Sequence, residues 1–365
     1  MDNDPTSASA LSVISSSVLA EDVRRAAAAA DCRLEEPNGR VDRLTWNRSP
    51  LIVLDADAAK GCIDAGQPRR PGVVLVCSGP ADVSVWQIAT SVGATAVLEM
   101  PEQEVALVQV LSAAPESSAG DGFAVAVTGG RGGAGSSVFA AALALAADAR
   151  ASRQRILLLD GDRNGGGIDL LLGLEDRPGP RWPGLVLEGG RVTSSALHAV
   201  LPRCGRALSV LACARTGSVT QPTPEAAQAV LDAGHVAGDF MVCDVPRHGD
   251  KSARAIAEAA DLAVIVVPAE LRAVAAAQAT AAWVREASAN AGVVVRGPSP
   301  GGLGAQAVAE TLRLPMLAAM RPQPGLATAL DSGGLRIRTR SPLWRAAERV
   351  LDLIESRTTN KAWAA

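Results

Sequence analysis

Short apolar runs alternate with stretches of helical spacing along almost the whole chain, and this alternation most restricts the possible fold. Each apolar run has the length and β-branched content of a strand buried on both faces, which is typical of parallel sheets. A parallel strand needs a crossover connection, usually a helix, before the next strand begins. The pattern therefore predicts the α/β fold class, with doubly wound parallel sheets covered by helices.

Two blocks of this alternation are separated by SAAPESSAGDG, a segment of small and polar residues that is typical of an interdomain linker. With 365 residues, the chain is also longer than one hydrophobic core normally organises. We therefore expect two domains, a linker and a tail. The expected boundaries are 1–111 for the first domain, 112–122 for the linker, 123–357 for the second domain and 358–365 for the tail.

The predicted strands follow from the apolar runs of each block. In the first block they are residues 11–17, 51–57, 72–78 and 95–101. In the second block they are residues 123–130, 156–162, 208–213, 239–245, 262–269, 291–297 and 315–320. The chain closes with SPLWRAAERVLDLIESR, whose apolar stripe predicts a final helix packed onto the second domain.

A glycine-rich loop follows the first predicted strand of the second domain and leads into a predicted helix. Its glycines permit positive φ angles and close backbone approach; they are Gly129, Gly130, Gly132, Gly133 and Gly135. At such a junction, backbone N–H groups and the helix dipole converge on an anion. The loop therefore predicts a phosphate-binding site.

Acidic residues end two of the following strands. Asp160 and Asp162 end the second strand of this domain, and Asp244 ends the fourth. Together with the loop upstream, this order favours a nucleotide site. The alternatives are a phosphotransfer site of the haloacid dehalogenase type or strand-end caps for the acidic pair, and a helix cap for Asp244.

These residues resemble the MinD/ParA family of deviant Walker A ATPases, whose P-loop has the pattern KGGxGK[ST][ST]. The matching stretch is RGGAGSSV, residues 131–138. On this resemblance, Arg131 replaces the signature lysine that reaches the partner subunit's nucleotide across a dimer. Ser136 replaces the lysine that contacts the β- and γ-phosphates. The implied nucleotide-binding residues are Gly132, Gly133, Ala134, Gly135, Ser136 and Ser137.

The resemblance extends over roughly residues 123–355 and implies further roles. Asp160 would orient the attacking water and, with Arg131, form the catalytic set. Ser137 and Asp244 would hold the metal. Arg296 stands where the family often has an asparagine that contacts adenine. The implied cofactor is ATP with Mg²⁺.

The missing loop lysine removes a charge-assisted contact worth about 1.5–3 kcal/mol, so nucleotide affinity should fall about ten- to a hundredfold. Hydrolysis should suffer more, because phosphoryl transfer relies on positive charge around the equatorial oxygens. Arg131 and Lys251 are the candidates to compensate, although a guanidinium fits a tight loop poorly. Three states stay open: weak ATP binding with little or no turnover, a nucleotide-free pseudo-ATPase, and an active ATPase.

The first domain resembles a response-regulator receiver, with Asp55 at the phosphoacceptor position. A working receiver also needs acidic residues after its first strand to bind magnesium, and a lysine after its fifth. At these places the chain has serines at 15–17, and Glu99 with Met100. We therefore expect Asp55 to be structural and the domain to be a pseudo-receiver that makes protein contacts.

A degenerate receiver joined to a MinD-like domain is the architecture of CpaE-like proteins, and the chain most resembles their septum site-determining (Ssd) branch. This implies a spatial regulator of cell division with weakened or lost ATP hydrolysis. The alternative is an active ATP-dependent positioning protein for a Tad-type pilus or secretion apparatus. The implied partners are proteins of these machineries, bound through the pseudo-receiver, and a homodimer is a further expectation.

Composition excludes several other classes. The absence of tyrosine excludes the tyrosine kinases of this superfamily, which phosphorylate their own tyrosine-rich tails. A net charge of −3 argues against DNA as a partner. The basic segment near the end is expected to be a solvated edge; it contains Arg336, Arg338, Arg340, Arg345 and Arg349.

Compartment and redox state follow from the first residues and from the cysteines. The opening MDNDPTSAS is acidic and polar, unlike a secretory signal. The six cysteines lack metal-ligand spacing and predict reduced, mostly buried thiols. No apolar run approaches about 18 residues, so membrane association would be peripheral or indirect only. We expect a cytoplasmic protein, with recruitment to the septum or pole left open.

Overall fold

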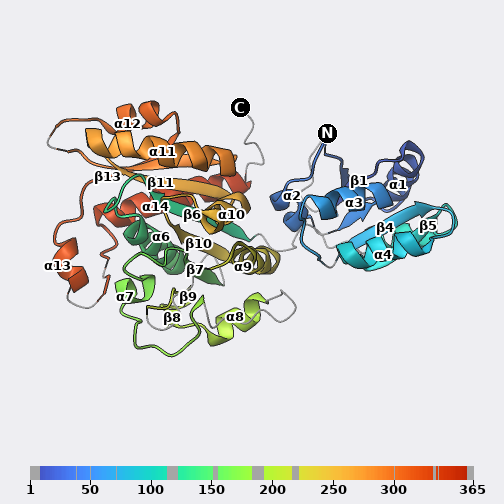
Figure 1. Ribbon diagram of the computed structural model, residues 1–365, viewed down its shortest axis with the longest axis horizontal. Coiled ribbons are helices and arrows are strands. Elements are labelled where there is room, and N and C mark those ends of the chain that lie inside the picture. Colours follow the sequence, from blue (N-terminus) through green and yellow to red (C-terminus); the bar gives the residue numbers. More distant parts are fainter. Residues whose placement is uncertain are drawn as a thin grey trace. The chain divides into compact units, whose positions relative to one another are not determined.

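The computed structural model describes residues 9–37, 39–49, 51–70, 72–112, 122–150, 155–182, 193–215, 222–299, 301–331, 334–335 and 337–359. The chain divides into two compact units, Met1–Asp121 and Gly122–Ala365. Figure 1 shows an α/β arrangement in each. Most of the expected linker and of the expected tail lies outside the described residues.

The described residues of the first unit form a five-stranded parallel sheet in the order β2-β1-β3-β4-β5. Its strands are β1 (Ser9–Val13), β2 (Arg33–Glu35), β3 (Ile52–Leu54), β4 (Val73–Ser78) and β5 (Ala96–Met100). Its helices are α1 (Ser17–Ala29), α2 (Arg43–Arg48), α3 (Ala56–Asp64), α4 (Val83–Val92) and α5 (Glu104–Ser112). Helices α1 and α5 cover one face of the sheet, and α2, α3 and α4 cover the other.

The described residues of the second unit form an eight-stranded sheet in the order β13-β12-β11-β6-β10-β7-β9-β8, in which β8 runs antiparallel to β9. The strands are β6 (Phe123–Gly129), β7 (Ile156–Asp160), β8 (Arg203–Cys204), β9 (Leu208–Leu211), β10 (Phe240–Val245), β11 (Leu262–Pro268), β12 (Ala291–Arg296) and β13 (Met316–Met320).

Helices cover both faces of this sheet (Figure 1). On one face lie α6 (Ser136–Arg150) and α14 (Pro342–Thr359), and on the other lie α9 (Pro224–Ala237), α10 (Lys251–Ala259), α11 (Leu271–Ala287) and α12 (Ala305–Leu312). The described residues of this unit also form three short helices: α7 (Ile168–Leu172), α8 (Ser194–Val200) and α13 (Leu326–Asp331).

The last helix packs as its sequence predicts. Its apolar stripe is buried in the core that also contains the apolar residues of α6, and it consists of Leu343, Trp344, Ala347, Val350, Leu351 and Ile354. Four arginines of the basic segment are exposed, namely Arg338, Arg340, Arg345 and Arg349, while Arg336 lies outside the described residues. The expected solvated edge is confirmed for these four residues.

Several strands end earlier than the apolar runs suggest, because the carboxyl-end residues bind helix N-termini or turns. The strand predicted at 51–57 stops at Leu54, since Asp55 caps α3. The strand predicted at 156–162 stops at Asp160, whose carboxylate accepts hydrogen bonds from the loop that follows. The acidic side chains therefore lie at the carboxyl ends of the strands of each sheet.

Two further findings concern the membrane and the thiols. Across the described ranges, no helix combines the length and the apolar character needed to cross a bilayer. All six cysteines lie in described residues and are free thiols; Cys77 and Cys204 are partly exposed and the others are buried.

Candidate functional site

The predicted phosphate loop connects β6 to α6. Gly130 N–H donates to the carbonyl oxygen of Val266 at 2.9 Å, which ties the loop to β11. A Cβ at Gly130 would lie 2.7 Å from the Cβ of Ala277, so this position needs glycine. Gly133 has φ +69° and Gly135 has φ +95°, the left-handed region that glycine adopts without strain.

The outer side of the loop is open. A Cβ at Gly132 or Gly133 would meet no atom within 4 Å among the described residues. Helix α6 begins at Ser136, and Phe139 N–H donates to the carbonyl oxygen of Gly135 at 2.9 Å. The loop and the first turn of a 15-residue helix therefore form the strand-to-helix junction that the sequence predicts.

Two of the three predicted acidic residues, Asp160 and Asp244, meet beside this junction. Strand β10 lies between β6 and β7, and Asp244 is in register with Asp160. Both residues are buried, with exposed fractions of 1% for Asp160 and 4% for Asp244. Together with Ser137 they line a cavity of about 240 Å³, which α7 and the end of α13 also border.

The carboxylate of Asp160 is held by backbone donors. It accepts hydrogen bonds from the N–H groups of Asp162 at 3.2 Å, Ile168 at 3.2 Å and Cys213 at 3.4 Å. Burial raises the pKa of Asp160 to about 6, and these three hydrogen bonds oppose the rise. The backbone thus fixes the orientation of this carboxylate.

The effect of burial on Asp244 is opposed by fewer hydrogen bonds than the effect on Asp160. Burial raises the pKa of Asp244 to about 8; the negative charges of Asp160 and Asp162 contribute, while a hydrogen bond from Ser137 opposes the rise. A cation bound in this cavity would favour the ionised form of Asp244 and so oppose the effect of burial. The raised pKa is therefore compatible with a site that binds a cation.

The donors present fit Mg²⁺ better than a metal that needs a full protein cage. Among the described residues, no group of three or more His, Cys, Asp or Glu side chains could hold a metal ion. Mg²⁺ commonly binds one or two protein oxygens and completes its shell with waters and substrate phosphates. The Ser137 hydroxyl and the Asp244 carboxylate are such a pair.

Two arginines belong to the loop or contact it. Arg131 Nη2 forms an ion pair with Glu270 Oε2 at 2.8 Å, and both side chains are partly exposed. Arg296 Nη2 donates to the carbonyl oxygen of Gly133 at 3.4 Å. The sequence prediction associated Arg296 with adenine, whereas the structure places its guanidinium against the phosphate loop itself.

Sequence reasoning missed the contacts that hold α7, the helix beside the cavity. Asp169 in α7 is buried, and its carboxylate forms ion pairs with Arg215 at 2.6 Å and Arg181 at 3.1 Å. On the C-terminal side, Leu335 N–H donates to the carbonyl oxygen of Leu171 at 2.7 Å. Helix α7 is therefore fixed by two arginines and by a distant backbone segment.

In the first unit, the carboxylate of Asp55 accepts three hydrogen bonds from backbone N–H groups of that unit. Its Oδ2 accepts from Ser15 N–H at 2.6 Å and Ser16 N–H at 2.9 Å, and its Oδ1 accepts from Ala58 N–H at 2.8 Å. The residue is 5% exposed. These contacts tie the β1–α1 loop to the start of α3, which agrees with a structural role.

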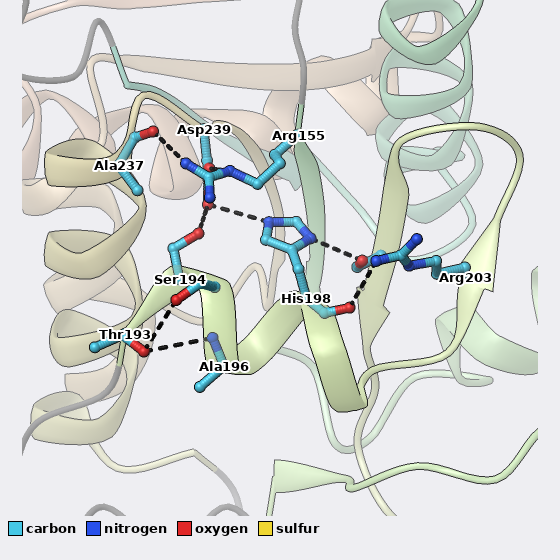
Figure 2. Close-up of polar contacts among 10 residues, drawn as sticks. Arg155, Thr193, Ser194, Ala196, His198, Arg203, Ala237 and Asp239 are labelled. Carbon is cyan, nitrogen blue, oxygen red and sulfur yellow. Dashed lines mark hydrogen bonds and ion pairs between the residues drawn. The ribbon is translucent and has the colours of Figure 1, made fainter.

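A second polar cluster lies at the amino ends of the strands, opposite the ends that carry Asp160 and Asp244, and Figure 2 shows its contacts. Asp239 precedes β10 and is 0% exposed; it forms an ion pair with Arg155 Nε at 2.9 Å and accepts a hydrogen bond from Ser194. His198 Nε2 lies 3.1 Å from Asp239, and its Nδ1 lies 2.8 Å from the hydroxyl of Ser209.

Serine, histidine and aspartate in contact have the composition of a hydrolase triad. Here Ser194, Ser209 and His198 are at most 5% exposed, and Ser194 contacts the aspartate instead of the histidine. A nucleophile must be reachable by its substrate, so the cluster is structural. It anchors α8 to the amino ends of β7, β9 and β10.

Comparison with known proteins agrees with this two-part architecture. A family model described as "Rv3660c-like, CheY-like N-terminal domain" matches residues 13–122. The protein Rv3660c of Mycobacterium tuberculosis strain H37Rv is 47% identical over 342 residues, which cover 92% of this chain and 95% of that protein.

Solved structures resemble the second unit. The cell division ATPase MinD of Pyrococcus furiosus matches with TM-score 0.55 and 20% identity, over 64% of this chain and 99% of that one. A ParA family ATPase from Chlorobium tepidum matches with TM-score 0.54 and 18% identity, over 64% and 99%. MinD of Pyrococcus horikoshii, solved with Mg-ADP, matches with TM-score 0.53 and 18% identity, over 66% and 99%.

Identities this low establish the fold alone. The second unit has the P-loop NTPase fold of the MinD/ParA proteins, and the first is CheY-like. Both parts of the fold predicted from the sequence are thereby confirmed.

Proposed function

The chain belongs to the family of the Mycobacterium tuberculosis protein Rv3660c, and from this premise we propose that it is a spatial regulator of cell division similar to septum site-determining, CpaE-like proteins. A MinD/ParA-like ATPase fold joined to a CheY-like domain suggests a positioning or division-type regulator. In the proposal, the second unit binds ATP with Mg²⁺ weakly, and its hydrolysis is weakened or lost.

One observation carries this proposal. Ser137, Asp160 and Asp244 line one cavity beside an open glycine loop, while the lysine position of that loop holds Ser136. The main-chain amides of 132–136 would bind phosphate, Ser137 and Asp244 would hold Mg²⁺, and Asp160 would orient water. Bound Mg²⁺·ATP would supply the phosphoryl group and the metal charge. The groups proposed to bind phosphate and Mg²⁺ are thus present, while the positive charge of the loop lysine is missing.

The fixed position of α7 supports a scaffold more than an efficient switch. A nucleotide switch needs two conformations with different ligand affinities. The ion pairs of Asp169 with Arg181 and Arg215 would have to break if α7 moved away from them. Asp169 is buried while Arg215 is partly exposed, so a movement that broke these pairs would leave a buried carboxylate without its partners, which is costly.

The proposed partners bind through the receiver-like unit. Helix α4 exposes Val83 and Trp86, with exposed fractions of 74% and 53%, and apolar side chains of this size favour protein contacts. MinD of Aquifex aeolicus has been solved in a MinC:MinD cell division protein complex. By analogy, we propose partners from the division machinery, homodimer formation, and recruitment of the protein to the septum or pole.

A second candidate is an active ATP-dependent positioning protein for a Tad-type pilus or secretion apparatus. The observation that favours it is the retention of both Asp160 and Asp244 in the cavity. Substantial ATP turnover in the purified protein, together with normal septum placement in cells without it, would support this candidate.

Two measurements test the main proposal. The first is calorimetric titration with Mg²⁺·ATP combined with a phosphate-release assay, in which we expect weak binding and little turnover. Ser136→Lys should bind about ten- to a hundredfold more tightly, and Arg345→Gln, on the exposed side of α14, is the matched control. The second is septum placement after depletion and overproduction. Unchanged septa in both conditions would contradict a role in division.

A further inference from the structure

A positive charge reaches the phosphate loop from another strand. Arg296 ends β12, which β11 separates from β6. Its Nη2 donates to the carbonyl oxygen of Gly133, and its Nη1 lies 3.5 Å from the place of a Cβ at Gly135. The guanidinium therefore lies against the two glycines whose left-handed conformations shape the loop.

We propose that Arg296 provides, within the same chain, the cationic contact to the nucleotide's phosphates that Ser136 cannot make. This inference rests on the nucleotide-binding role proposed for the loop. It assigns Arg296 to phosphate in place of adenine. It also explains how a loop without its lysine retains affinity for a polyanion.

The charges around Arg296 favour an anionic ligand. Among the described residues, no carboxylate forms an ion pair with Arg296, and its bond to Gly133 is long. Burial lowers the pKa of Arg296, the nearby Arg131 lowers it further, and Glu270 opposes both. A guanidinium in this situation gains more from a phosphate than from a carbonyl oxygen, because charge-assisted bonds are about twice as strong as neutral ones.

The neighbouring ion pair strengthens this argument. Glu270 is already bound by Arg131, so the two guanidinium groups share one carboxylate and leave a net positive charge. The Nε of Arg131 is buried without a hydrogen-bond partner in the described part of the chain. The positive charge of Arg131 therefore acts on Arg296 without being fully neutralised by hydrogen bonds of its own.

The approach from outside the loop avoids the steric problem of a guanidinium inside it. An arginine at position 136 would have to fit within a tight turn, which suits a compact ammonium better. Arg296 instead approaches from the end of β12, and its guanidinium contacts the loop at the carbonyl oxygen of Gly133. Its planar fork could then contact two phosphate oxygens at once.

The test is a double-mutant cycle measured by calorimetric titration with Mg²⁺·ADP, a probe that is not hydrolysed. Arg296→Gln should weaken binding about ten- to a hundredfold, and Arg296→Lys should fall between this variant and the wild type. Ser136→Lys should restore binding in the Arg296→Gln background and should add less in the wild-type background. Arg345→Gln is the control, and circular dichroism with a thermal melt checks that each variant is folded.

The outcomes separate this inference from the proposed function. If the wild type binds Mg²⁺·ADP and Arg296→Gln binds it equally well, the inference about Arg296 is wrong while the proposed function stands. Tighter binding by Arg296→Gln also overturns it, because the arginine would then obstruct the site. Binding by Ser136→Lys but not by the wild type shows that Arg296 does not compensate. Absence of binding by both overturns the proposed function and the inference together.

Discussion

Replacing Asp244 by asparagine should stabilise the ligand-free protein. Burial raises the pKa of this carboxyl from 3.8 to about 8, so at pH 7 the folded protein must hold a proton that the unfolded chain releases. The interval from 3.8 to pH 7 is about 3 pH units at about 1.36 kcal/mol each, which makes the cost about 4 kcal/mol. Asparagine keeps an acceptor for Ser137 without the charge. We expect a gain of about 2–4 kcal/mol.

The sign of the pH dependence follows from the same shift. Between pH 4 and pH 8 the unfolded state binds fewer protons at this position than the folded state does. The penalty from burying Asp244 is therefore absent at low pH and grows as the pH rises towards about 8, so this group makes the fold less stable with rising pH. Asp244→Asn should lack this part of the pH dependence.

The assay is thermal and chemical unfolding from pH 5 to pH 8, with and without Mg²⁺·ADP. The gain should raise the melting temperature of the second unit by about 4–16 °C, at about 2–4 °C per kcal/mol. Asp176→Asn, at an exposed position of the same unit, is the matched control. Mg²⁺·ADP should stabilise the wild type more than Asp244→Asn. Destabilisation by Asp244→Asn at pH 7, or an unchanged pH slope, would refute the reasoning.

Three further predictions follow from particular contacts. Asp55→Ala removes the acceptor of three backbone N–H groups and should destabilise the first unit by about 2–4 kcal/mol. Urea unfolding, monitored by hydrogen exchange, measures this loss of stability. A loss below about 0.5 kcal/mol would contradict the prediction. Gly130→Ala should cost about 1–3 kcal/mol because its Cβ would overlap Ala277, whereas Gly132→Ala should be tolerated; equal thermal stabilities would disprove the difference. Asp169→Asn should weaken the ion pairs that hold α7 and accelerate amide exchange across 161–172. Unchanged exchange in this segment would show that Arg181 and Arg215 do not hold α7 in place.

Much of the fold could be predicted because buried parallel strands have continuous apolar runs. Every strand of the second sheet except β8 coincides with a predicted run. The short edge strands β2 and β8 escaped prediction because they have three and two residues and lack such a run.

The candidate site, like the fold, could be predicted from the sequence only in part. The meeting of Asp160 and Asp244 could be predicted, because the carboxyl ends of parallel neighbours lie at one edge of a sheet. The contact of Arg296 with the loop could not, because it depends on the strand order β12-β11-β6. The partners of Asp169 are 12 and 46 residues away in sequence, and no local pattern joins them. The role of each residue towards nucleotide stays a prediction.

In the proposed site, the amides around residues 131–138 bind an anion and face the aspartates of β7 and β10. Hydrogen exchange with mass spectrometry, with and without saturating Mg²⁺·ADP, measures this binding at the amides themselves, because bound phosphates should protect them. We expect Mg²⁺·ADP to slow exchange in 131–138, and to slow it less in Arg296→Gln. Unchanged exchange throughout this segment in the presence of Mg²⁺·ADP would contradict the proposed site.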